Sequence, residues 1–123
     1  MAYMTDRKRA EGLGSARTGS AHHWQMTLSS YALLILTPLF LIAFGPVLGA
    51  PHAEVLAHFA RPFPAIVTAL MIVTGFQHFR QGVQVAIEDY THGQTRHLLI
   101  VAMVCLSYGA MAVGLFALVR LAL

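Results

Sequence analysis

The residues best suited to chemistry lie between Gly75 and Gly82, where His78 sits inside a long apolar run. An ionisable side chain at membrane depth is costly, so such a histidine is a functional candidate by default. On a helix with about 100° per residue, both glycines fall on the His78 face, and Asp89 follows about 16 Å along the axis. Glycine lets a cofactor or another backbone approach closely. This pattern predicts a flat, bulky cofactor against the helix and a polar site at the membrane edge.

The His78 imidazole suits iron as well as zinc, and haem iron requires an axial ligand such as histidine. No other histidine of the chain is expected at the same depth. His92 and His97 belong to one membrane edge, and His52 and His58 belong to the other. If His78 binds haem, the second axial ligand must come from another chain. The alternative interpretation is an imidazole that is hydrogen-bonded to a neighbouring helix and binds no cofactor.

Asp89 and Tyr90 form the second candidate site, at the end of the same predicted helix. An acidic residue at a helix C-terminus opposes the helix dipole, which suggests a functional reason for its presence. A tyrosine hydroxyl can donate to a carbonyl such as that of a quinone, and a neighbouring carboxylate can pass protons. The alternative is an ordinary interfacial pair. Arg80 is a candidate partner for a haem propionate, or an interfacial cation.

The composition excludes a water-soluble fold. The 123 residues are 57% hydrophobic and 11% charged, whereas soluble domains carry about 25% charged residues. Basic residues flank the apolar segments and form no stripe along the chain, which argues against nucleic-acid binding. The single cysteine, Cys105, excludes an internal disulfide and is interpreted as a small buried hydrophobe.

The apolar segments predict an all-α integral membrane protein with three transmembrane helices, part of a multi-subunit helix bundle. We expect one domain, 1–123, with a tail at 1–23 and spans at about 28–48, 63–88 and 97–119. Pro38 is expected to kink the first span. A connection rich in proline and glycine precedes the second span, and Ala53 to Ala60 are expected to form a short helical turn there.

The distribution of basic residues predicts the topology. They concentrate in the tail, which contains no apolar stretch near Met1 and therefore no signal peptide. The positive-inside rule then places the N-terminus in the cytoplasm and the proline-rich connection outside. A bacterial cytoplasmic membrane is the expected location, and the mitochondrial inner membrane is less favoured. His52 and His58 are six residues apart and share no helical face, so no metal site is expected there.

Around His78 and Asp89-Tyr90 the sequence resembles the small haem-anchor subunits, the D subunits, of succinate dehydrogenase (respiratory complex II). That family has a histidine in the second span, a glycine four residues on, Gln-Val, and Asp-Tyr eleven and twelve residues after the histidine. The matching residues are His78, Gly82, Gln84-Val85 and Asp89-Tyr90, together with His23-Trp24 and Pro38 near and in the first span. Many relatives carry an arginine about four residues after that tryptophan. Here Leu28 or Ser29 stands there, so the role of that arginine is not transferred.

The resemblance implies a role for each matching residue. His78 would be one axial ligand of haem b, with the other supplied by a companion cytochrome b anchor subunit. Tyr90 would hydrogen-bond ubiquinone, and Asp89 would support that site. The iron–sulfur subunit would dock over this edge and deliver electrons. FAD and the iron–sulfur clusters would lie on the flavoprotein and iron–sulfur subunits, and this chain would hold no catalytic residue of its own.

Three competing functions remain open from the sequence. The first is a small transport bundle that uses His78 and Asp89 as a proton relay. The second is a purely structural anchor, and the third is the anchor of a fumarate-reducing complex. Redox partners set the direction of electron flow, so this chain alone does not distinguish the third from succinate oxidation.

Overall fold

The computed structural model describes residues 5–12 and 19–123, and within these ranges every regular element is a helix. The elements in order are α1 (Asp6–Gly12), α2 (Gly19–Phe44), the 3₁₀ turn η1 (Gly45–Val47), α3 (His52–Phe59), α4 (Pro62–Tyr90) and α5 (Gly93–Ala122). Three segments are long and apolar enough to cross a membrane: Ser20–Val47, Pro62–Tyr90 and Gly93–Ala122. The prediction of an all-α protein with three membrane-spanning helices is therefore confirmed. Residues 1–4 and 13–18 of the predicted tail lie outside the described residues.

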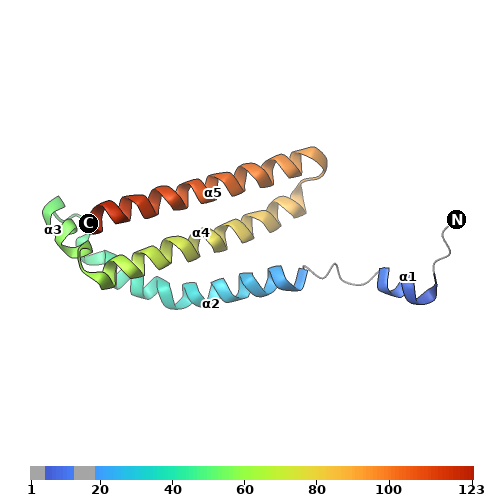
Figure 1. Cartoon of the computed structure of the whole chain (residues 1–123), viewed down its shortest axis with the longest axis horizontal. Helices are drawn as coiled ribbons and strands as arrows, with labels where there is room; N and C mark the ends of the chain where they lie inside the picture. The colour runs from blue at the N-terminus through green and yellow to red at the C-terminus, as the bar shows by residue number, and fades with distance from the viewer. Residues whose placement is uncertain (1–4, 13–18) are drawn as a thin grey trace.

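The three long helices lie in a single layer with α4 in the middle (Figure 1). Each neighbour is antiparallel to α4, and both pack along it. No Cα atom of α2 lies within 8 Å of one in α5. The short helix α3 covers one end of the layer, where it contacts α4, α5 and η1. Because the layer is one helix thick, both of its broad faces are open to lipid or to partner chains.

The connections are set by residues with restricted or unusual backbone geometry. Gly49 has a φ of +78° in the loop after η1, a conformation that favours glycine. Pro62 occupies the first turn of α4, where a missing N–H costs nothing. At the other end, the Thr91 hydroxyl donates to the Ile87 carbonyl over 2.6 Å and closes α4. Gly93, with a φ of +63°, then allows the chain to reverse into α5.

Few side chains are buried in this layer. The buried hydrophobic residues are Ala43, Phe59, Val67, Met103 and Leu118, and the buried polar ones are Thr68, Gln81 and Ser107. Large apolar side chains such as Leu34 and Phe116 instead face outward, as expected where the solvent is lipid. Cys105 is exposed, so its interpretation as a buried residue is wrong. The cause is the layer itself, which covers only a narrow strip of α5.

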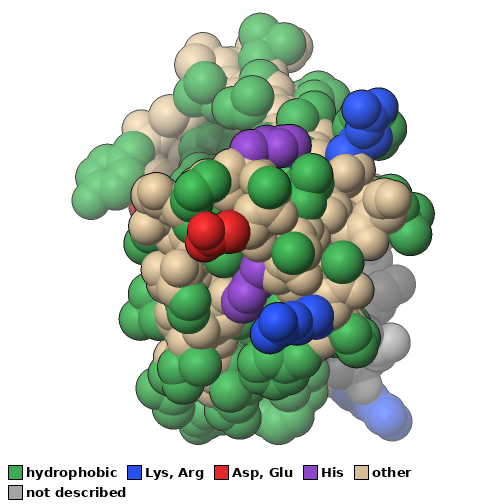
Figure 2. Space-filling model, turned by 90° about the vertical axis from the view of Figure 1, so that its left-hand side faces the viewer, with side chains coloured by type: hydrophobic (Ala, Val, Ile, Leu, Met, Phe, Trp, Pro, Cys, Tyr) green, Lys and Arg blue, Asp and Glu red, His purple; other side chains and the backbone are tan. Residues whose placement is uncertain are grey.

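The end of the layer near α3 is held by a compact contact. His58 Nε2 lies 2.7 Å from the carbonyl oxygen of Ala43, in the last turn of α2. Beside it, Phe59 packs against Phe44 with ring centroids 6.1 Å apart and is only 1% exposed. Figure 2 views this end, where histidine, acidic and basic side chains gather among hydrophobic ones. Such a mixture is typical of a membrane–water boundary.

Replacing Phe59 with alanine is expected to destabilise the fold by about 3 kcal/mol, because it leaves a cavity where α3 meets α2. Thermal unfolding of the detergent-solubilised chain, followed by circular dichroism, measures the effect. Phe63→Ala is the matched control, since Phe63 lies close in sequence but is 55% exposed. Equal loss of stability in both variants would contradict the role given to Phe59.

Candidate functional site

His78 lies on the face of α4 that packs against α2 and is half-buried there. Its Nδ1 atom is 3.0 Å from the hydroxyl oxygen of Ser29, on α2. Ser29 also lies 3.3 Å from Oε1 of Gln81, which is 3% exposed. The helices therefore bring together three polar side chains, Ser29, His78 and Gln81, within an otherwise apolar interface. We call this group the interface triad.

The two glycines beside His78 have different surroundings. A Cβ atom built on Gly75 would meet nothing within 4 Å, so the backbone there faces open space. A Cβ atom on Gly82 would lie 3.7 Å from the terminal methyl carbon of Met26 on α2. Only Gly75 thus has the open surroundings expected beside a bulky cofactor, whereas Gly82 packs against a neighbouring helix.

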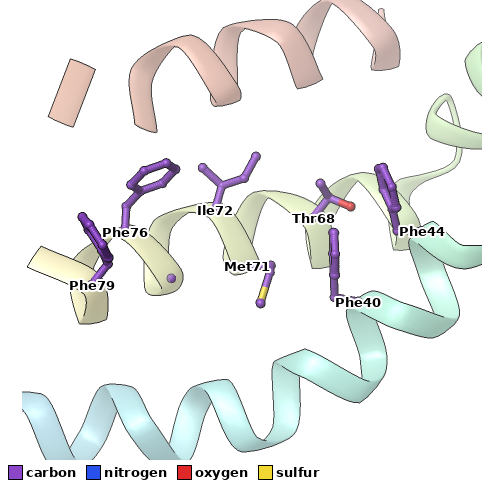
Figure 3. Close-up of a pocket in the computed structure, with 8 residues that line it drawn as sticks. Phe40, Phe44, Thr68, Met71, Ile72, Phe76 and Phe79 are labelled. Atoms are coloured by element: carbon purple, nitrogen blue, oxygen red, sulfur yellow. The ribbon is translucent and has the colours of Figure 1, made fainter. Parts of the chain in front are cut away.

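An apolar pocket runs along α4 between Thr68 and Phe79 and is closed on one side by two phenylalanines of α2. Its volume is about 480 Å³. The lining residues are Phe40, Phe44, Thr68, Met71, Ile72, Gly75, Phe76 and Phe79. In Figure 3, Phe40 extends from α2 toward α4, and Met71 extends from α4 toward α2. Gly75 and Phe79 are three residues before and one after His78, so the pocket lies within one helical turn of His78, which does not itself line it.

Arg80 lies on the other side of α4, facing α5. Its guanidinium carbon is 5.8 Å from the ring centroid of Tyr108, a cation–π distance. Its Nε atom is buried and has no hydrogen-bond partner among the described residues. Residues two apart point about 200° from each other on a helix, so Arg80 and His78 serve opposite faces. The structure does not bring Arg80 and His78 together.

Asp89 and Tyr90 occupy the last positions of α4 and are exposed, Tyr90 to 87%. Their neighbour Glu88 is engaged differently. It accepts a hydrogen bond of 3.0 Å from the Gln84 amide and lies 3.8 Å from the Arg96 guanidinium at the start of α5. This contact ties the α4–α5 turn together. Within the described ranges Asp89 forms no ion pair, so its carboxylate and the Tyr90 hydroxyl are available to a ligand or a partner surface.

The two candidate sites lie at different depths. His78 and Asp89 are eleven residues apart on one continuous helix, or about 16 Å along its axis. That separation exceeds any direct hydrogen bond, so a proton relay between them would need several intermediate groups. Over the part of the chain that the structure describes, no group of three or more His, Cys, Asp or Glu residues could hold a metal ion. His58, at the far end, has its Nε2 atom engaged by the Ala43 carbonyl.

The residues around His78 fit one half of a haem site. The apolar pocket, the open backbone at Gly75 and the half-buried imidazole are the features that a flat macrocycle with an axial histidine requires. No described histidine of the chain lies opposite His78 to provide a second ligand. A haem bound at this position would therefore take its second ligand from another chain.

Ser29 and the buried amide of Gln81 were not identified as site residues from the sequence. Ser29 and Ser30 are adjacent, and serine in a membrane helix commonly bonds its own backbone. Apolar residues are spread almost evenly around α2, so its sequence does not indicate whether Ser29 or Ser30 faces α4. The sequence did show polar residues in both of these spans. Which of them contact each other depends on the register of α2 against α4, and the sequence of one helix does not give that register.

Comparisons with known proteins agree on one family. Residues 1–117 match the family described as succinate dehydrogenase/fumarate reductase transmembrane subunit. A succinate dehydrogenase hydrophobic membrane anchor subunit from Paracoccus denitrificans is 46% identical over 123 residues, covering 100% of this chain and 95% of that protein. A protein of the same description from Rickettsia bellii (strain RML369-C) is 32% identical over 99 residues, 77% of each chain. No solved structure gave a significant match.

Proposed function

The chain belongs to the succinate dehydrogenase/fumarate reductase transmembrane subunit family, and on that basis we propose that it is the membrane anchor of a succinate dehydrogenase, co-ligating haem b and forming part of the ubiquinone-reduction site. The relatives named as succinate dehydrogenase anchors favour this assignment over a fumarate reductase. The observation that carries the haem proposal is the half-buried His78 beside an apolar pocket with open backbone at Gly75.

In this proposal His78 would hold the haem iron through one ring nitrogen, and a companion cytochrome b anchor subunit would provide the second ligand. When bound, haem b provides a one-electron store within the membrane. The Phe40 and Phe76 rings and the other apolar lining residues would exclude water from the macrocycle. Arg80 is left out of this site, because it faces α5 and Tyr108 on the opposite side of the helix.

The exposed end of α4 would form one wall of the quinone site. Reduction of a quinone to a quinol consumes two electrons and two protons, so the site must stabilise the carbonyl oxygens and deliver protons. The Tyr90 hydroxyl donates a hydrogen bond to one carbonyl, and the Asp89 carboxylate orients polar groups and carries protons from water. Beside these residues, Glu88 lies 3.8 Å from Arg96 and so links the end of α4 to the start of α5. Electrons come from the iron–sulfur subunit, which docks over this edge.

The proposed orientation places this edge on the cytoplasmic side of a bacterial membrane. Arg96 lies at the same end as the N-terminus of α2, whereas Arg61 and Arg120 lie at the opposite end with α3 (Figure 1). Together with the basic tail, this distribution favours an N-terminus in the cytoplasm under the positive-inside rule.

Purification of the tagged chain from its native membrane tests the proposal. The expected result is a complex that contains a flavoprotein, an iron–sulfur protein and a second membrane chain, with a b-type reduced-minus-oxidised spectrum and succinate–ubiquinone reductase activity. Untagged membranes carried through the same steps give the background. A chain that purifies without a flavoprotein and without haem would overturn the proposal and favour a transport bundle.

A further inference from the structure

We propose that Ser29 is a positioning residue for the haem ligand: its hydroxyl oxygen accepts a hydrogen bond from Nδ1–H of His78 and so leaves the Nε2 lone pair free for iron. This inference rests on the proposed function, because it concerns how this chain prepares its ligand. It adds a residue on a different helix, 49 positions earlier in the chain, to the haem site.

The number of donors and acceptors around Ser29 supports this direction of the hydrogen bond. The Ser29 oxygen lies 2.8 Å from the Met26 carbonyl oxygen, 3.0 Å from His78 Nδ1 and 3.3 Å from Gln81 Oε1. A serine hydroxyl carries one hydrogen and two lone pairs. Two of the three neighbours are oxygens that only accept, and the shortest of the three contacts is to one of them. The hydrogen therefore goes to an oxygen, and the remaining contact requires His78 Nδ1 to be the donor.

The same conclusion holds if the Gln81 amide is turned by 180°. Its nitrogen would then donate to a Ser29 lone pair, and the Ser29 hydrogen would still go to the Met26 carbonyl. A second lone pair remains for His78 Nδ1–H. In both arrangements Nε2 is the deprotonated ring nitrogen, and this is the tautomer that binds a metal through Nε2.

The hydrogen bond also restricts the ring. A second partner on the distal nitrogen of a ligating histidine fixes the ring orientation and raises its basicity. Because Ser29 belongs to α2 and His78 to α4, the ring plane depends on the packing of two helices. A more basic imidazole stabilises ferric over ferrous iron, so loss of this bond should raise the midpoint potential.

Three variants of the purified complex test the role of Ser29. Ser29→Ala removes the hydroxyl with little change in volume. Ser30→Ala is the matched control, because the Ser30 hydroxyl donates to the Met26 carbonyl over 2.9 Å on the exposed side of α2. Ser29→Thr keeps the hydroxyl. The readouts are the midpoint potential of the haem, by redox titration of its absorption, and the rate at which haem passes to an apoprotein acceptor.

In Ser29→Ala we expect the ferric-to-ferrous ratio at a fixed potential to fall by about tenfold, which is 59 mV for a one-electron couple. Haem loss should be about tenfold faster. Removing a hydrogen-bond partner of a metal-ligating residue typically lowers metal affinity by about 10- to 100-fold, and we expect the lower end of that range. Ser30→Ala and Ser29→Thr should remain near wild type. Equal shifts in Ser29→Ala and Ser29→Thr would indicate altered packing and overturn the inference.

His78→Ala in the same series separates the two proposals. If His78→Ala loses the haem while Ser29→Ala keeps the wild-type potential and haem retention, the role of Ser29 is overturned and the haem ligand stands. If His78→Ala keeps the haem with an unchanged spectrum, the ligand assignment fails and the role of Ser29 fails with it.

Discussion

Replacement of His78 with alanine is expected to remove the b-type haem signal from the purified complex. The imidazole is half-buried between α4 and α2, beside the apolar pocket, and the described part of the chain offers no second histidine at that depth. Without an axial nitrogen from this chain, the macrocycle would keep only the companion subunit's ligand. The haem content per flavin, from the reduced-minus-oxidised spectrum, measures the loss, and we expect a fall of at least about tenfold.

His52→Ala is the matched control for this experiment. His52 is exposed at the first position of α3, at the opposite end of the layer from the α4–α5 turn. Its replacement should leave the haem content unchanged. A normal spectrum in His78→Ala, or an equal loss in both variants, would contradict the ligand assignment.

Replacement of Tyr90 with phenylalanine is expected to lower succinate–ubiquinone reductase activity by about tenfold or more. The change removes one hydroxyl from an exposed ring and leaves the helix end intact. Leaving a quinone oxygen without its hydrogen-bond donor in a desolvated site costs about 1–3 kcal/mol of binding free energy. A difference of about 1.36 kcal/mol in the activation free energy corresponds to a tenfold change in rate. Succinate oxidation with an artificial dye as acceptor should be unaffected, because that reaction does not use the quinone site.

Tyr31→Phe provides the control for Tyr90→Phe. Tyr31 is 63% exposed on α2, away from the α4–α5 turn, and no quinone role is proposed for it. Its activity with both acceptors should match wild type. If Tyr90→Phe also retains full ubiquinone reductase activity, Tyr90 is an interfacial residue only, and the chain is a structural anchor on this edge.

The helices were predictable from the sequence because their cause is local. Uninterrupted apolar runs of membrane-spanning length leave a helix as the only element that satisfies its own backbone in lipid. The helix at His52–Phe59 follows a proline-rich loop and was also expected as a short turn. His78 was recognisable as a candidate because an imidazole in such a run is unusual whatever surrounds it.

Contacts between helices were not predictable in the same way. The bond between Ser29 and His78 depends on the rotation and register of α2 against α4, and neither is encoded in one helix alone. The same holds for Met26 against Gly82, which changes the interpretation of that glycine from cofactor clearance to helix packing. Arg80 was a candidate for a haem propionate or an interfacial cation, and its contact with Tyr108 likewise depends on how α4 and α5 are rotated against each other.

The arrangement of α2 and α5 on opposite sides of α4, without contact between them, has a consequence for the life of the chain in the cell. Among the three long helices, each outer one packs against α4 alone, so a newly inserted chain leaves both broad faces of the layer uncovered until its companions arrive. Membrane proteases remove subunits in that state, because the partly open form is what they cleave. The cellular amount of this chain should therefore follow the supply of its companions, and raising its own gene dosage should mainly increase its turnover.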